Sequence, residues 1–99
     1  MIARIRHGRT KVSDATAYLQ YLFQSVIPTY RTTKGNRGGW VLRRVEGDVA
    51  HFITLSFWDS QDAIAAFAGA DTAVVKYYPE DEKYLLEFEP TVKHYELFG

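Results

Sequence analysis

Four side chains in one alternating stretch are suited to line a binding pocket. In residues 49–58, every second side chain shares one face of the expected strand, and these include Phe52, Thr54, Ser56 and Trp58. Two hydroxyls between two aromatic rings suit a planar, partly polar ligand. The alternative is that Trp58 only packs against the following helix and donates its indole N–H to a carbonyl. We therefore keep both interpretations of this face.

The histidines are the candidate bases. His7 alternates with Ala3 and Ile5, so it points to the helix side of the sheet if those two residues belong to the core. A neutral imidazole there can take a phenolic proton near neutral pH. A hydrogen-bonded structural histidine is the alternative. His51 alternates with strongly apolar residues and is expected at an interface, and His94 is expected to be partly exposed.

Tyr78 and Arg37 are the candidate polar anchors. Tyr78 can donate a hydrogen bond to an oxyanion or a substrate carbonyl, or it is an aromatic plug over the core. Arg37 lies in the glycine-rich segment 34–39, and its guanidinium suits a carboxylate or a phosphate. The histidines lack metal-binding spacing, and the acidic run 80–82 is typical of a solvated loop. Neither a metal site nor a bound cofactor is predicted.

The elements that must position these residues alternate in type. Strands are predicted over 2–7, 39–46, 49–58 and 84–97, and helices over 15–27, 59–69 and 71–78. The order β-α-β-β-α-β predicts an α+β, ferredoxin-like fold with an antiparallel sheet, as a single domain over residues 1–99.

Local signals set the expected ends of these elements. Ser13 and Asp59 are expected to cap the first and second helices, and Pro28 is expected to kink or end the first. Gly69 suits the end of the second helix, and Gly47 suits a tight hairpin turn between two strands.

The charges divide between the two halves of the chain. Residues 1–50 hold nine lysines and arginines against three acidic residues, and residues 51–99 hold the reverse. Because the first and last strands of this fold are neighbours, Arg4 and Arg6 are expected to pair with Glu87 and Glu89. Internal pairing disfavours a nucleic-acid surface, and no nucleic-acid partner is predicted.

Composition points to self-association and excludes thiol chemistry. The chain is 46% hydrophobic and 15% aromatic, which is more apolar surface than one small core needs, so a homodimer is expected. It has no cysteine, which excludes thiol nucleophiles, thiolate metal sites and disulfides. Charged residues near the start and the lack of a long apolar run predict a cytoplasmic protein with no membrane partner.

The segment 55–63 carries a family resemblance. A strand that ends at Trp58, followed by Asp59-Ser60-x-x-Ala63 at a helix start, resembles the antibiotic biosynthesis monooxygenase family of dimeric α/β barrels. The loop 35–38 and the run Tyr77-Tyr78-Pro79 support it. The resemblance implies a homodimer whose two sheets close into a barrel, with a pocket in each subunit between sheet and helices.

The resemblance also implies functions. The family includes oxygenases that use neither metal nor flavin, heme-degrading enzymes, and proteins with no established activity. Our leading hypothesis is a cofactor-independent monooxygenase-like protein acting on a small aromatic or polyketide-type substrate. In this hypothesis, His7 is the base, Tyr78 is a donor, and Trp58 is a catalytic residue at the pocket. The substrate-binding residues are then Phe52, Thr54, Ser56, Tyr77 and Arg37.

Two alternatives remain. The first is a non-enzymatic barrel whose pocket holds a ligand or is filled by its own side chains. The second is heme binding or degradation. Tyr77 and Tyr78 fall where the heme-degrading relatives place an iron-binding histidine, and those relatives need an asparagine near Arg6 and His7. This chain has neither of those two residues at those positions.

Overall fold

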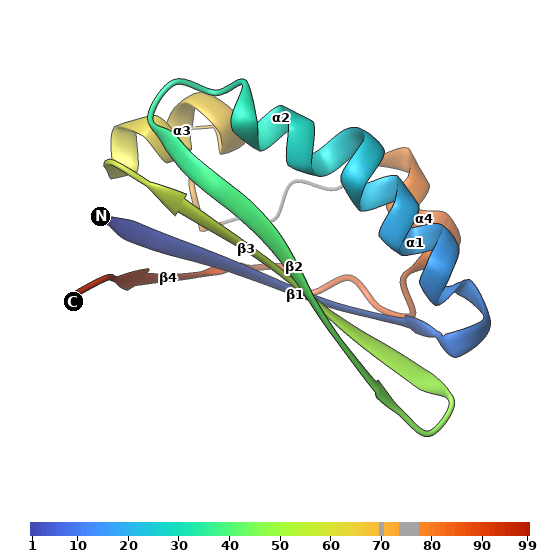
Figure 1. Cartoon of the computed structure of the whole chain (residues 1–99). Helices are drawn as coiled ribbons and strands as arrows, with labels where there is room; N and C mark the ends of the chain where they lie inside the picture. The colour runs from blue at the N-terminus through green and yellow to red at the C-terminus, as the bar shows by residue number, and fades with distance from the viewer. Residues whose placement is uncertain (70, 74–77) are drawn as a thin grey trace.

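The fold was analysed in a computed structural model, which describes residues 1–69, 71–73 and 78–99. Four strands form one antiparallel sheet in the order β2-β3-β1-β4, and the labelled helices all cover the same face of it (Figure 1). The strands are β1 (Ile2–Lys11), β2 (Asn36–Glu46), β3 (Val49–Trp58) and β4 (Lys93–Glu96). The helices are α1 (Ala15–Tyr21), α2 (Ile27–Arg31), α3 (Gln61–Ala68) and α4 (Pro79–Tyr84). The predicted ferredoxin-like α+β fold is confirmed.

The long central strands give the sheet two distinct faces. β1 and β3 pair without a break from Ile2 opposite Trp58 to Lys11 opposite Val49. Because side chains alternate across a strand, the even-numbered residues of both strands face the helices and the odd-numbered residues face away. We call these the helix side and the open side of the sheet. The β2–β3 hairpin turns at Gly47, whose φ of +61° suits glycine.

The first helical segment does not end at Pro28, although an end was one of the two expected outcomes, the other being a kink. A short 3₁₀ turn (Val12–Asp14), α1, a π-helical turn (Leu22–Val26) and α2 follow one another without interruption. Pro28 lies in the first turn of α2, directly after the π-helical turn. Ser13 lies inside the 3₁₀ turn and does not cap a helix.

The second helix begins one residue later than predicted. Ser60, not Asp59, is the N-cap of α3, and its Oγ accepts a hydrogen bond from the backbone N–H of Ala63. Asp59 instead binds Arg37. Gly69 ends α3 with a φ of +91°, as expected.

The C-terminal third departs most from prediction. Most of the helix predicted over 71–78 lies outside the described residues. The acidic run expected as a loop forms α4, because its carboxylates favour a helix N-terminus and Pro79 suits the first turn. The long strand predicted over 84–97 is wrong: only Lys93–Glu96 pairs with β1, and Leu85 makes an isolated bridge with Thr10.

The core lies between the helix side of the sheet and the helices. Its completely or nearly completely buried aromatic and aliphatic residues include Tyr18, Leu22, Val26, Ile27, Tyr30, Phe52, Trp58, Ile64 and Phe67. Among the described residues, no helix is long and apolar enough to cross a membrane.

Candidate functional site

Phe52, Thr54, Ser56 and Trp58 share one face, as predicted, and all four are buried on the helix side. The indole Nε1 of Trp58 donates a hydrogen bond of 2.9 Å to Ser56 Oγ. The Trp58 ring packs edge-on against Tyr30, with centroids 6.0 Å apart. Trp58 is therefore oriented by its own strand and by an aromatic neighbour.

Arg4 and Arg6 also lie on the helix side, so their expected pairing with Glu87 and Glu89 is wrong. Arg6 Nη2 lies 3.1 Å from Asp81 Oδ2 instead. Glu87 binds Arg9, and Glu89 binds His7. The reason is strand parity, because Arg4 and Arg6 face the helices while His7 and Arg9 face the open side.

Asp81 is the carboxylate that pairs with Arg6 on the helix side of the sheet. It is completely buried, and its carboxylate accepts hydrogen bonds from the backbone N–H of Tyr78 at 2.8 Å and from the Tyr18 hydroxyl at 3.3 Å. Burial raises the pKa of the Tyr18 phenol, which therefore stays protonated and can donate. Arg6 thus has a carboxylate partner that is itself held in place.

Arg4 has no such partner. Its side chain is only 2% exposed, and burial lowers the pKa of its guanidinium. One donor binds the Tyr30 hydroxyl, and Cζ lies 5.4 Å from the centre of the Phe67 ring. Within the part of the chain that the structure describes, its Nε and Nη2 atoms are buried and have no hydrogen-bond partner. A positive charge with two free donors is therefore buried beside the aromatic residues.

His94 of β4 lies next to Arg4. The two residues are directly opposite each other across the β1–β4 pair, as Arg4 and Ser56 are across β1–β3. Burial, and next the Arg4 charge, lower the pKa of His94 below its ordinary value of 6.5. Its Nε2 is buried and has no hydrogen-bond partner among the described residues. Ser56, Arg4 and His94 thus form a row across three strands, with a neutral imidazole at its outer end.

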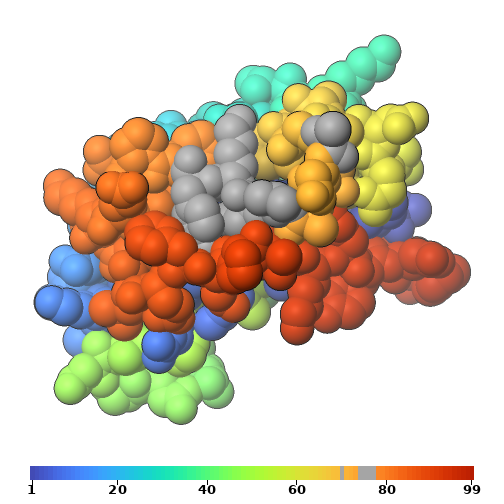
Figure 2. Space-filling model, turned by 180° about the vertical axis from the view of Figure 1, so that it is seen from behind, coloured from blue at the N-terminus to red at the C-terminus, as the bar shows by residue number. Residues whose placement is uncertain are grey.

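A hollow gives access to the outer end of this row. It has a volume of about 310 Å³ and is lined by Ile2, Gln61, His94, Tyr95 and Glu96. Figure 2 shows the C-terminal segment, in red, crossing this edge of the molecule below the helical layer. His94 therefore faces both the buried Arg4 and a space open to solvent.

The other predicted residues are distributed as follows. Tyr78 is half-buried, and burial, followed by the nearby Tyr30 hydroxyl, raises the pKa of its phenol. Tyr77 lies outside the described residues. Arg37 is exposed and binds Asp59 through Nε at 2.6 Å and Nη2 at 3.1 Å, so its expected carboxylate partner belongs to the chain itself.

The expected place of His7 on the helix side is wrong. His7 lies on the open side, where its Nδ1 is 2.7 Å from Glu89 and its Nε2 is 3.1 Å from Nδ1 of His51. The physical reason is that Ala3 and Ile5, which share a face with His7, face away from the helices. Among the described residues, no cluster of three or more histidine and acidic side chains is placed to hold a metal.

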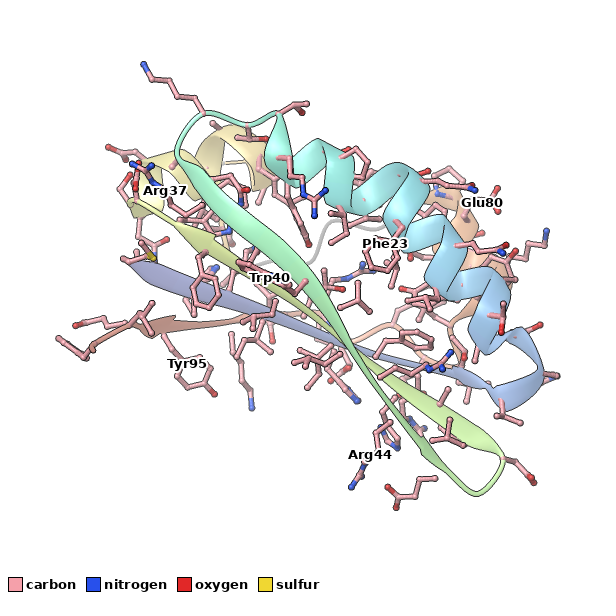
Figure 3. The ribbon with its side chains drawn as sticks, viewed as in Figure 1. Phe23, Arg37, Trp40, Arg44, Glu80 and Tyr95 are labelled. Atoms are coloured by element: carbon pink, nitrogen blue, oxygen red, sulfur yellow. The ribbon has the colours of Figure 1, made fainter. Side chains whose placement is uncertain are left out.

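The open side carries several large apolar side chains, and no helix of the described residues covers it. Its large exposed side chains include Trp40, Leu42 and Tyr95, and Trp40 stacks edge-on with Phe57 at 5.5 Å. Figure 3 shows Tyr95 and Arg44 projecting away from the helices. A hollow of about 320 Å³ lies here between β1, β2 and β3, lined in part by His7 and His51. His51 is half-buried in this surface.

Sequence reasoning did not predict that Arg4, Asp81 and His94 lie on the same buried side of the sheet. The available signal was the alternation of Arg4 and Arg6 in β1, which matches that of Trp58 in β3 once the strand register is known. Asp81 gave no signal, because it follows a proline in an acidic run that is typical of an exposed loop.

Comparisons with solved structures support this fold. The heme-degrader MhuD from Mycobacterium tuberculosis, with two hemes bound in its active site, aligns with a TM-score of 0.59 and 20% identity over 98% of this chain and 95% of that one. A point mutant of MhuD with two manganese protoporphyrin IX molecules per active site aligns with a TM-score of 0.60 and 19% identity, over 98% and 94%. Rv0793 from the same organism aligns with a TM-score of 0.61 and 17% identity, over 99% and 95%.

The chain therefore has the same ferredoxin-like α+β fold as these structures. No known family's sequence profile matches the chain, and no curated protein matches it either. At 17–20% identity the likeness concerns the fold alone.

Proposed function

We propose that the protein oxidises a small aromatic or polyketide-type molecule with O₂ on the helix side of its sheet, without a bound metal or flavin. The observation that carries the proposal is the pair of His94 and Arg4, a neutral base beside a buried cation. This proposal assigns the base to His94 in place of His7. Tyr78 keeps the role of hydrogen-bond donor that the sequence suggested, whereas Trp58, a catalytic residue in that hypothesis, here only packs beside the Arg4 site.

The chemistry requires the substrate to supply the electrons. His94 takes a proton from an acidic CH₂ or phenol, and the positive charge of Arg4 stabilises the carbanion or phenolate that forms. The electron-rich anion then reduces O₂ and forms a peroxide at carbon. For an anthrone-type CH₂, the peroxide loses water to leave a carbonyl, so one oxygen atom enters the product and the other leaves as water.

Oxygen uptake tests this proposal. Purified protein with a panel of anthrones and hydroquinones is expected to consume oxygen above the rate without protein, and His94→Gln is expected to lose most of that rate, on the order of 10²-fold or more. His51→Gln is the matched control, because it removes a histidine from the open side and is expected to keep the rate. A folded protein that consumes no oxygen with any member of the panel would leave a binding protein as the better account.

We also infer that two copies pair through the open side. Trp40 is 51% exposed and Leu42 equally so, and a monomer would leave both in water beside Tyr95. Light scattering is expected to give twice the chain mass of 11.4 kDa. Leu42→Lys is expected to halve it, because a charge on this surface opposes burial. A wild-type chain that scatters as a monomer at micromolar concentration would refute the pairing.

Heme binding is the second candidate, and a specific observation favours it. The buried Nε2 of His94 has no partner among the described residues, and an imidazole nitrogen is a suitable iron ligand. Two structures with this fold are described with heme or a metalloporphyrin in their active sites. Hemin is expected to give a shifted Soret band with the wild-type protein and a smaller shift with His94→Ala. An unchanged free-hemin spectrum would exclude this candidate.

A further inference from the structure

Two arginines of β1 face the same buried layer, but only one has a counterion. Arg6 is paired with the buried Asp81. No ion pair involves Arg4 among the described residues, and the remaining residues, 70 and 74–77, include neither aspartate nor glutamate. A buried cation without an anion is costly. The chain itself therefore leaves one positive charge in this layer to be neutralised from outside.

The free donors of Arg4 form a recognisable edge. Its Nε and Nη2 are the two atoms without partners. Arg9 uses the same two atoms to bind both oxygens of Glu87, at 2.6 and 2.9 Å, and Arg37 uses them to bind both oxygens of Asp59. This side-on fork matches the spacing of a carboxylate. The same edge that binds a carboxylate at Arg9 and at Arg37 is buried at Arg4 and has no hydrogen-bond partner among the described residues.

The surroundings of Arg4 favour a flat ligand. The Phe67 ring lies over the guanidinium, and Trp58 and Tyr30 lie beside Phe67, with ring centroids 5.8 and 4.8 Å from it. On β4, the residue directly opposite Arg4 is His94, which lines the hollow at this edge. Arg4 is buried next to His94 and does not itself line this hollow, so we infer that a planar acid reaches Arg4 past His94.

We propose that the ligand of this site is an aromatic carboxylate, whose two oxygens bind Nε–H and Nη2–H of Arg4. An aromatic carboxylate would then be the substrate class of the proposed oxidation. The inference rests on the proposed function for the reaction alone, because ligand binding is measured without turnover. The group that gives up its proton to His94 then lies next to the carboxylate on the ring, as in a hydroxy acid of the naphthoate type.

The test compares one ring system with and without its charge. The chain has two tryptophans, so Trp40→Phe leaves Trp58 as the only indole reporter, and its fluorescence is titrated with 2-naphthoate, 2-naphthamide and 2-naphthalenemethanol. The carboxylate is expected to bind at least tenfold more tightly than either neutral compound. Equal affinity for all three would overturn the inference.

Variants of Arg4 assign the effect to its guanidinium edge. Arg4→Met is expected to abolish the preference for the acid, and Arg4→Lys is expected to keep only part of it, because an ammonium lacks the fork. Arg9→Gln is the matched control, since it removes a bidentate arginine from the open side, and it is expected to keep the full preference. An unchanged preference in a folded Arg4→Met protein would overturn the inference. If Arg4→Met does not fold, the wild-type ligand series decides.

The two proposals fail in different ways. Tight naphthoate binding without oxygen uptake, with hydroxynaphthoates included in the panel, keeps the carboxylate site and rejects the oxidation. Oxygen uptake on neutral anthrones that falls in Arg4→Met, together with equal affinity for the acid and the neutral compounds, keeps the oxidation and rejects the carboxylate site. Protoporphyrin IX, titrated in the same way, distinguishes a porphyrin propionate from a free aromatic acid as the source of the carboxylate.

Discussion

The two ends of the buried layer on the helix side contrast in how their charge is balanced. At one end, Arg6 is held by Asp81, which is in turn held by the N-terminus of α4 and by Tyr18. At the other end, Arg4 has an aromatic neighbour and a hydroxyl but no carboxylate. The first arrangement is complete within the chain and serves folding. The second is incomplete, and we interpret it as a binding site.

The largest expected effect on stability comes from removing the Arg6–Asp81 ion pair. Asp81→Asn leaves Arg6 buried without its counterion and is expected to lower the free energy of unfolding by about 3–5 kcal/mol. Urea unfolding measures the change. A loss of less than about 1 kcal/mol would mean that the Arg6–Asp81 pair does not balance this end, and the contrast would fail.

Removing the charge at the incomplete end is expected to act in the opposite direction. Arg4→Met deletes a buried cation that has no anion and fills the space with an apolar chain, so the free energy of unfolding is expected to rise by about 1–3 kcal/mol. The same urea experiment, without added ligand, measures it. A destabilisation as large as that of Asp81→Asn would show that Arg4 is a structural residue and would count against the carboxylate site.

The bond between Trp58 and Ser56 is expected to matter less. Ser56→Ala leaves the buried indole N–H without an acceptor, which is expected to cost about 1–2 kcal/mol of the free energy of unfolding. Ser60→Ala, at the cap of α3, is a control for the loss of a hydroxyl, with an expected cost of about 1 kcal/mol. Urea unfolding followed by circular dichroism measures the free energy of unfolding of both variants. An unchanged stability in Ser56→Ala would show that Trp58 is held by packing alone.

The smallest effect expected is a pH dependence from His94. Its pKa in the folded chain is below the ordinary value of 6.5, so as pH falls the unfolded chain binds the proton first. The free energy of unfolding should therefore decrease from about pH 6.5 downward and level off below the folded pKa. His94→Gln is expected to lack this component, which the difference between the two stability curves isolates. A wild-type minus His94→Gln difference in the free energy of unfolding that shrinks as the pH rises toward 6.5 would contradict the lowered pKa.

The candidate site was only partly predictable, for a reason that lies in the sheet. Alternation correctly grouped Phe52 with Trp58, and it also grouped His7 with Ile5. It could not say which group faces the helices, because both faces of β3 are apolar: one packs on the helices, and the other is the exposed open side. Taking Ile5 as core therefore placed His7 on the wrong face and concealed Arg4.

The sequence by itself determined the order and type of most elements, the β2–β3 hairpin and the shared face of the Trp58 group. These follow from local propensity and from periodicity within single segments. Only the tertiary structure decided that Asp81 neutralises Arg6, that His94 lies beside Arg4, and that Arg4 lacks a carboxylate. Such facts depend on strand register and on side chains far apart in the chain, and electrostatic balance in a buried layer is a property of the whole set of neighbours rather than of any one segment.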